Sequence, residues 1–123
     1  VYISGPMTGI PEWNAPAFAT ARSELDELGF DPFNPATANT IDEAKCWEEY
    51  LAGDLTWFAD HPGCRTMALL EDWHLSRGSR LEVQWALRHN WLLLKRLDGL
   101  YIVSPHGPIL QKLREASKAY DAA

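Results

Sequence analysis

The sequence contains no long apolar run, no paired cysteines and no excess of basic residues, and each absence excludes a class of protein. Apolar runs such as residues 91–94 are short, whereas a membrane-spanning helix needs roughly 20 apolar residues. Cys46 and Cys64 stand alone, without the spacing of a zinc site or a disulfide framework, so we expect no bound metal. With 11 Lys and Arg against 17 Asp and Glu, the net charge of -6 disfavours binding to duplex nucleic acid.

The chain does have enough apolar mass for a core, and its elements follow an alternating order. At 123 residues, with 46% of them hydrophobic, we expect a single domain over residues 1–123. Strand-like and helix-like segments alternate, which predicts an α/β fold. We expect a doubly wound, flavodoxin-like or Rossmann-like domain with a mostly parallel sheet of four to five strands. No charged leader with a long apolar segment opens the sequence, so we expect a cytoplasmic protein.

Hydrophobic periodicity and capping residues place the individual elements. Strands are expected at residues 1–4, 66–73, 91–94 and 100–103, with a short edge strand interrupted by proline at residues 30–36. Helices are expected at residues 14–28, 40–59, 80–90 and 109–120. The inner sides of the first and last helices are predicted to consist of Phe18, Ala21, Leu25 and Leu28, and of Ile109, Leu110, Leu113 and Ala116. The segment "KRLDG" fits either a hairpin turn or a short loop.

Asp54 falls on the apolar side of the predicted helix at residues 40–59. At 100° per residue, with residue 47 at zero, Asp54 lies at roughly 340°, between Tyr50 at roughly 300° and Phe58 at roughly 20°. A solvated acid belongs on the opposite face, because burying an unpaired charge is costly and raises the pKa of a carboxyl group. Two interpretations stay open: a structural Asp bonded to a backbone amide or an Arg, and an acid with a catalytic task.

Glu82, at the end of "SRGSRLE", also has two interpretations. With Ser79 as N-cap it would complete a capping box, which stabilises a helix start by about a kcal/mol and explains the glutamate by itself. On the helical wheel, however, Glu82 lies between Trp85 and Ala86, on a face turned away from bulk water. It also follows a predicted buried strand, at the edge where open α/β sheets bind ligands. A helix N-terminus would keep the carboxylate ionised, as a nucleophile must be.

The loop "SGPMTG" after the first strand is a third candidate. Gly5 and Gly9 would let backbone N–H groups approach an anion or a ribose closely. Two glycines without a following Lys do not make a P-loop, and they suit an ordinary turn equally well. The position of the loop favours a ligand site, because "SGPMTG" and "SRGSRLE" are both expected at the carboxyl edge of central strands.

Together, "YISGPMTG", the Asp of "LAGDL" and "SRGSRLE" resemble the motifs of the nucleoside 2-deoxyribosyltransferase superfamily. The likeness is greatest to a compact branch of unknown function that is common in phage and bacterial genomes, and it covers about residues 1–91. The superfamily cleaves N-glycosidic bonds, in base-exchanging transferases and in hydrolases of deoxynucleoside monophosphates. Its chemistry is that of a retaining glycosidase, so the resemblance implies no metal or redox cofactor.

The resemblance implies a role for each matching residue. Glu82 corresponds to the nucleophile that attacks C1′ of the sugar, Asp54 to the acid that handles the leaving base, and Tyr2 to the tyrosine that orients the nucleophile. Ser76 corresponds to a serine that contacts the 5′-phosphate in the nucleotide hydrolases. Thr8 stands where one hydrolase branch has a phosphate-binding Arg, which leaves the phosphate state of the substrate open. The implied substrate-binding positions are Gly5, Pro6, Met7, Thr8, Gly9, Ser76, Gly78 and Ser79.

Three readings of the function follow. The first is an enzyme that cleaves a nucleoside or nucleoside 5′-monophosphate, by hydrolysis or by base exchange. The second is a non-catalytic module that binds or sequesters a nucleotide, in which Trp73 and His74 would stack on the ligand. The third is a structural protein that reuses the fold, because a fold does not by itself specify a function. The resemblance also implies a homo-oligomer, a dimer or larger.

Overall fold

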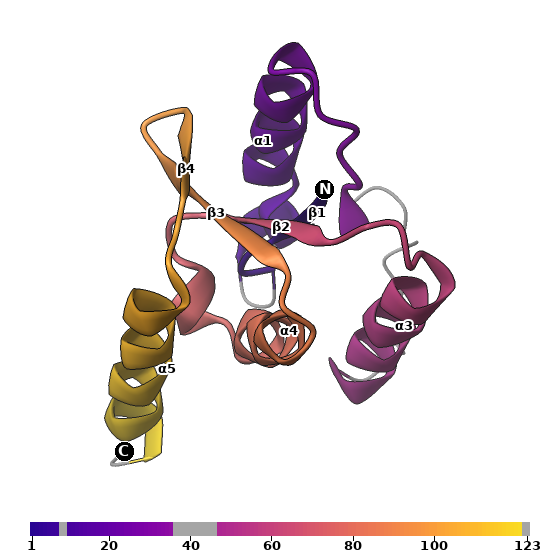
Figure 1. Cartoon of the computed structure of the whole chain (residues 1–123). Helices are drawn as coiled ribbons and strands as arrows, with labels where there is room; N and C mark the ends of the chain where they lie inside the picture. The colour runs from indigo at the N-terminus through magenta and orange to yellow at the C-terminus, as the bar shows by residue number, and fades with distance from the viewer. Residues whose placement is uncertain (8–9, 36–46, 122–123) are drawn as a thin grey trace.

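A computed structural model describes residues 1–7, 10–35 and 47–121 of the chain as a mixed α/β fold (Figure 1). No helix within these ranges is long and apolar enough to cross a membrane. The α/β class expected from the alternating pattern is therefore confirmed, while the predicted helix start at residues 40–46 lies outside the described residues. The elements are β1 (Tyr2–Ser4), the 3-10 turn η1 (Pro11–Asn14), α1 (Ala15–Glu27), α3 (Trp47–Asp60), β2 (Thr66–Leu69), the 3-10 turn η2 (Trp73–Leu75), α4 (Arg77–Arg88), β3 (Leu92–Leu97), β4 (Leu100–Val103) and α5 (His106–Asp121).

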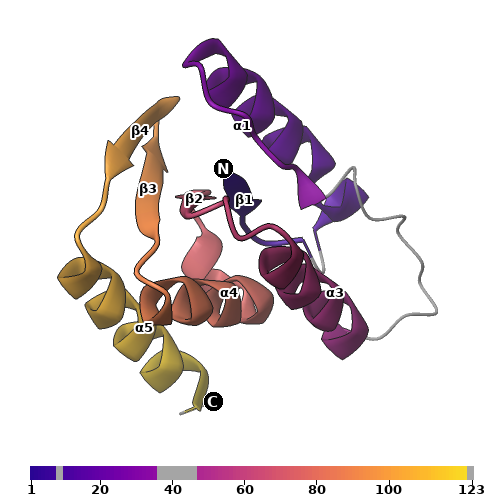
Figure 2. The same ribbon diagram turned by 45° about the vertical axis from the view of Figure 1, so that its right-hand side comes forward.

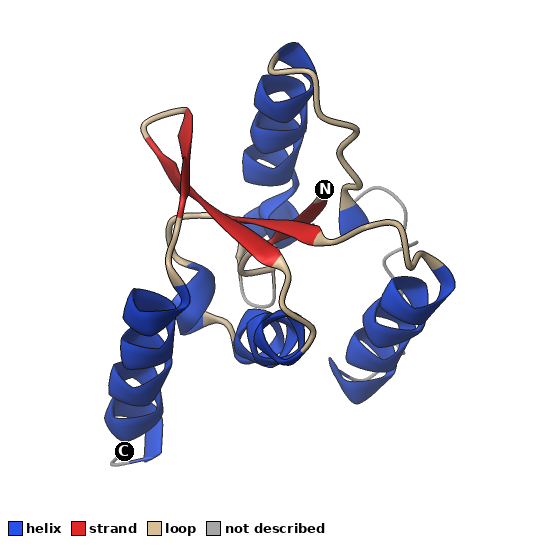
Figure 3. Cartoon of the chain, in the orientation of Figure 1, coloured by secondary structure: helices blue, strands red, loops and turns tan. Residues whose placement is uncertain are grey.

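The strands form one open sheet in the order β1-β2-β3-β4, drawn in red in Figure 3. β1, β2 and β3 are parallel, and β4 runs antiparallel to β3, so the prediction of a mostly parallel sheet is confirmed. Ile3 pairs with Ala68, which pairs in turn with Leu94, and all three are buried. The expected proline-interrupted edge strand is reduced to a single parallel bridge between Phe33 and Tyr2.

Helix α1 covers one face of the sheet. Its residues Phe18, Ala21 and Leu25 are fully buried against side chains of the first three strands, as their spacing predicted. Leu28 was expected to complete this buried stripe but is 59% exposed. The helix ends at Glu27, and the chain turns away through Gly29, whose φ of 90° suits only glycine well, so Leu28 leaves the buried side.

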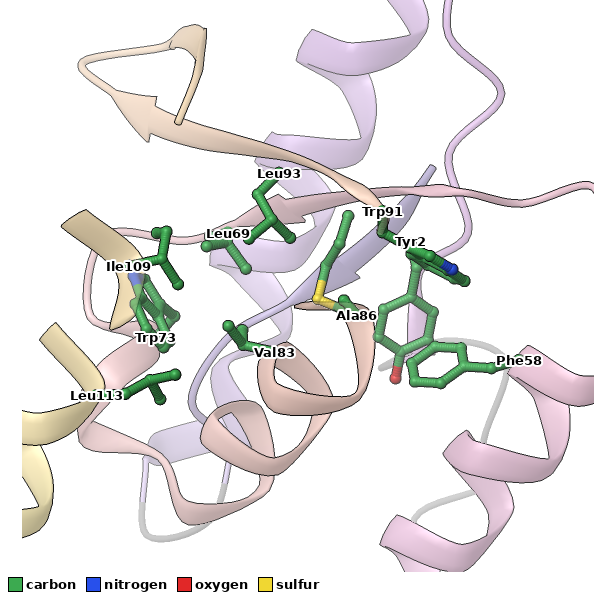
Figure 4. Packing of buried hydrophobic residues seen from close by; sticks show 11 residues of the cluster. Tyr2, Phe58, Leu69, Trp73, Val83, Ala86, Trp91, Leu93, Ile109 and Leu113 are labelled. Carbon is green, nitrogen blue, oxygen red and sulfur yellow. The ribbon is translucent and has the colours of Figure 1, made fainter. Parts of the chain in front are cut away.

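Helices α3, α4 and α5 lie on the opposite face, with α4 between the other two in both views (Figures 1 and 2). Side chains from these helices meet the sheet in a second buried cluster, in which Tyr2 packs against Phe58 at a ring distance of 4.6 Å (Figure 4). Ile109 and Leu113 of α5 are buried as predicted, whereas Leu110 is 41% exposed. Among these positions, the helix therefore presents a narrower apolar stripe than its sequence suggests.

The predicted strand at residues 66–73 is shorter than expected. β2 ends at Leu69, and the backbone N–H of Trp73 donates a hydrogen bond to the Leu70 carbonyl across a turn. The side chain of Trp73 then packs into the cluster beside Ile109 and Leu113 (Figure 4). Burying this large ring under α5 therefore sets where the strand stops.

The segment "KRLDG" contains a hairpin turn: its first three residues extend β3 beyond the predicted strand end at residue 94, and its last two form the turn. Asp98 and Gly99 have φ angles of 49° and 80°, which is the pattern of a two-residue type I′ turn. Arg96 fastens the hairpin to α1, because its Nε and Nη2 atoms lie 2.8 and 3.0 Å from the two carboxylate oxygens of Glu24. The Tyr101 hydroxyl donates a further bond of 3.0 Å to Glu24.

Replacing Gly5 is expected to destabilise the fold. A Cβ atom at this buried position would lie 2.6 Å from Cδ1 and 2.8 Å from Cγ of Leu70, so Gly5→Ala forces the two strand ends apart. We expect the free energy of unfolding, measured in urea, to fall by about 1–3 kcal/mol. Gly63→Ala is the matched control, because nothing lies within 4 Å of its new methyl group. Equal stability of the two variants would contradict the close approach at Gly5.

Candidate active site

Helix α4 begins three residues before the predicted start, and this changes the position of Glu82. Ser76 is the N-cap, and its hydroxyl accepts a hydrogen bond of 3.2 Å from the Ser79 backbone N–H. Glu82 is therefore a residue of the second helical turn and does not complete a capping box with Ser79, so that interpretation is wrong. Both serines fit an N-cap, and sequence alone did not distinguish them.

The carboxylate of Glu82 points into the sheet, and only 5% of the residue is exposed. The Tyr2 hydroxyl donates a hydrogen bond of 2.5 Å to Oε2, and the Ser4 hydroxyl donates one of 2.8 Å to Oε1. Both donors come from β1, whose alternate residues face α4. Each oxygen of the carboxylate is thus held by a side chain of the first strand.

Ser79 extends this network by one hydroxyl. Its Oγ lies 3.0 Å from Oγ of Ser4, and the residue is 1% exposed. When Glu82 is ionised, its carboxylate only accepts hydrogen bonds, so in that form Ser4 gives its single proton to Glu82 and receives one from Ser79. Ser79 was expected to bind substrate, but the structure places it behind Ser4. Ser4 itself was missed, although its place two residues after Tyr2 puts it on the same face of the strand.

Asp54 approaches the same carboxylate from α3. It forms side-chain hydrogen bonds that act on both Glu82 and Tyr2, and its negative charge acts on both as well. Figure 4 shows the Tyr2 hydroxyl directed between α3 and α4, beside Phe58, which follows Asp54 by one helical turn. A hydrogen bond between two carboxyl groups requires a proton on one of them. The structure therefore brings the three predicted catalytic residues together.

Burial controls the ionisation of both Glu82 and Tyr2. Removal from water raises the pKa of Glu82 well above its ordinary value, and the charge of Asp54 raises it further. The hydrogen bonds from Tyr2 and Ser4 act in the opposite direction, because they stabilise the carboxylate form. Burial also raises the pKa of Tyr2, so its hydroxyl stays protonated and serves as a donor.

The loop after β1 lies at the carboxyl end of that strand. Gly5 is buried against Leu70, and Asn14 Nδ2 donates a hydrogen bond of 2.9 Å to the Pro6 carbonyl. Met7 packs against the cluster under α1. These contacts hold the described part of the loop against the sheet, whereas Thr8 and Gly9 lie outside the described residues.

The remaining predicted positions lie in the first turn of α4. The Ser76 hydroxyl accepts the capping bond from Ser79, so it has a structural task whether or not it also meets a ligand. Gly78 is partly exposed in the same turn. Both residues lie close along the helix to Glu82, but their link to a substrate rests on the resemblance alone.

A cleft of about 350 Å³ opens on the other face of the sheet. Pro6 is the predicted site residue in its wall, and Glu82 takes no part in it. The cleft is lined by Pro6, Asn14, Ala17, Thr20, Leu70, Glu71, Asp72 and Arg96. The Glu82 carboxylate lies on the face of the sheet that α3 and α4 cover. The candidate site is therefore not in this cleft.

Aromatic rings surround Tyr2 and fix its position. Phe33 and Trp57 stack on each other at 4.2 Å, and both adjoin Tyr2. Sequence analysis did not select either ring, because they lie far apart along the chain. Trp73, by contrast, was expected to stack on a ligand in a binding module, and it is instead 1% exposed in the core. His74, its neighbour, is only partly buried.

Residues 1–94 match the model of a protein family described as a domain of unknown function, DUF4406, and the chain belongs to this family. The matched span contains the whole of the site, from Tyr2 through Asp54 to Glu82. No curated protein and no solved structure matches the chain. The family description states no activity, so the function rests on the chemistry of the site.

We expect the free energy of unfolding of Glu82→Gln to increase relative to that of the natural chain as the pH rises. Because the pKa of Glu82 is raised on folding, the folded state keeps its proton to a higher pH than the unfolded state, and stability falls between those two pKa values. Glutamine removes this loss. Urea unfolding from about pH 4 to about pH 8 should show the advantage growing by up to about 1.4 kcal/mol per pH unit in that window.

The control for this series is Glu27→Gln, which neutralises an exposed glutamate at the end of α1. Its unfolding free energy should run parallel to that of the natural chain. A parallel course for Glu82→Gln as well would mean that Glu82 gains its proton no more readily in the folded state than in the unfolded state.

Proposed function

We propose that the protein cleaves the N-glycosidic bond of a nucleoside or nucleoside 5′-monophosphate, as a member of the nucleoside 2-deoxyribosyltransferase superfamily. The observation that carries this proposal is the meeting of two carboxyl groups, Glu82 and Asp54, at the buried hydroxyl of Tyr2. A buried carboxyl group beside a second acid is costly to the fold, and such pairs are characteristic of sites that perform acid and nucleophilic chemistry. A protein that only binds a nucleotide has no need of it.

In this reaction the two carboxyl groups have different tasks, because one is the nucleophile and the other carries a proton. The bonds from Tyr2 and Ser4 stabilise the carboxylate form of Glu82, and in this form it attacks C1′ of the sugar and forms a covalent glycosyl ester. Asp54 carries the proton and delivers it to the leaving base, so that the base departs neutral while the C1′–N bond breaks. Water, or an acceptor base in a transferase, then attacks C1′ and gives its proton to Asp54, while the bond from C1′ to Glu82 breaks and Glu82 leaves as a carboxylate.

The order of the strands supports a ligand site at this place. From β1 the chain passes to the Phe33 bridge on one side, and it later returns to β2 on the other side. If the bridge counts as a vestigial strand, the sheet has the doubly wound order in which ligands bind beside the first strand, at the carboxyl edge. The loop after β1 and the first turn of α4 both lie at that edge.

The direct test is release of free base, followed by liquid chromatography from a panel of ribo- and deoxyribonucleosides and their 5′-monophosphates. We expect release from at least one class, with kcat falling at least ~10³-fold in Glu82→Gln and ~10²–10⁴-fold in Asp54→Asn. Glu27→Gln is the control and should keep full activity. Nucleotide binding without release from any substrate would instead establish the non-catalytic binding module.

Ser4 is expected to act as a positioning residue in this reaction. Ser4→Ala removes the donor to Oε1, so Glu82 should ionise less readily and the acid limb of the kcat/KM profile should move to higher pH. On that limb we expect a roughly ten- to hundredfold loss, since a hydrogen bond to a charged group is worth about 1.5–3 kcal/mol.

The control for Ser4→Ala is Ser23→Ala, which changes an exposed serine of α1. It should leave both the activity and the pH profile unchanged. A uniform loss in Ser4→Ala at every pH, with no movement of the acid limb, would reduce Ser4 to a packing role.

A further inference from the structure

Helix α4 separates the acid pair from a second polar region. Asp54 belongs to α3 on one side of α4, while α5 and η2 lie on the other side (Figures 1 and 2). Arg80 and Glu82 are two positions apart on α4, so their side chains leave the helix roughly 200° apart. Arg80 turns toward η2, where its Nη1 donates a hydrogen bond of 3.0 Å to the carbonyl of His74.

Basic side chains from three elements gather around the ring of His74. Lys112 of α5, Lys95 of β3 and Arg80 of α4 each act on it by Coulombic repulsion, and Asp72, at the N-cap of η2, is the acid that opposes them. Burial and these three cations lower the pKa of His74. Lys95 follows Leu93 by two strand positions and so faces the same side of the sheet as α5.

Three cations that act on one imidazole ring are unexpected on a chain with a net charge of -6. Lys95 and Lys112 are both partly buried, and neither forms an ion pair with any residue of the described ranges. Mutual repulsion between partly buried cations works against the fold, and it is relieved when an anion lies between them.

One ring nitrogen of His74 also lacks a hydrogen-bond partner among the described residues. Its Nδ1 atom is buried and makes no hydrogen bond to any described residue. A buried polar atom in this state calls for an explanation, and a bound ion or ligand is one of the ordinary explanations. An oxyanion among the cations would supply both the missing acceptor and the missing negative charge.

We propose that Lys95, Lys112, Arg80 and His74 form a binding site for a phosphate-type anion between β3, η2, α4 and α5. The two ammonium groups and the guanidinium neutralise the phosphate oxygens, and the imidazole donates a hydrogen bond to one of them. The anion is either free phosphate or the phosphate group of a nucleotide. This site lies on the opposite flank of α4 from Asp54, so it does not depend on the proposed glycosidic reaction.

The test is the titration of His74 in the natural chain, followed by NMR of its imidazole and assigned with His74→Gln. At constant ionic strength, millimolar inorganic phosphate should raise the pKa of His74, because the anion stabilises the imidazolium form. Lys112→Met and Lys95→Met should each raise that pKa without phosphate, and each should weaken phosphate binding about tenfold or more. Arg114→Met, an exposed change on the same helix, is the matched control and should alter neither quantity.

Two ligands separate the possible sources of the anion. A deoxynucleoside 5′-monophosphate and inorganic phosphate are titrated in parallel, with the unphosphorylated nucleoside as the negative control. Equal effects of both phosphates identify a free-anion site, and a much stronger effect of the nucleotide identifies a nucleotide site. No movement of the His74 titration with either phosphate would overturn the proposal. So would an equal response in the Lys112→Met and Arg114→Met variants, since that would reflect general screening.

Discussion

The hydrogen bond from Tyr2 to Glu82 ties the first strand to α4 inside the core, and the rest of the site depends on it. A carboxylate that is only 5% exposed is tolerated because two hydroxyl donors of β1 meet its two oxygens. Tyr2 reaches this position because Phe58 packs against the edge of its ring and Phe33 stacks on it. The packing of the aromatic rings around Tyr2 therefore also fixes the position of the Glu82 carboxylate.

The buried carboxyl group of Glu82 has an energetic consequence for the whole domain. Burial of the Glu82 carboxyl group beside the charge of Asp54 disfavours its ionisation, and the surrounding apolar cluster has to offset that cost. The large rings of Trp73 and Trp91 contribute to that cluster.

Charge of opposite sign is also kept apart by α4. Glu82 lies on the side of α4 that faces the sheet, where it meets Asp54. Arg80 lies on another side of the helix and acts on His74 together with Lys95 and Lys112. The helix holds each set of charges at its own place, since its backbone fixes the angle between Arg80 and Glu82.

The order and type of the main elements were determined by the sequence, because alternation and helical spacing are local properties that α1 and β3 express in their own residues. Two assignments were wrong for a local reason as well. The apolar spacing that ends in Leu28 does not show where the helix stops, and both Ser76 and Ser79 fit the N-cap of α4. What only the tertiary structure decided is the role of Ser4, which meets Glu82 across 78 positions of the chain. The gathering of the cations around His74 is of the same kind. Such contacts depend on how strands and helices pack, and no window of sequence contains both partners.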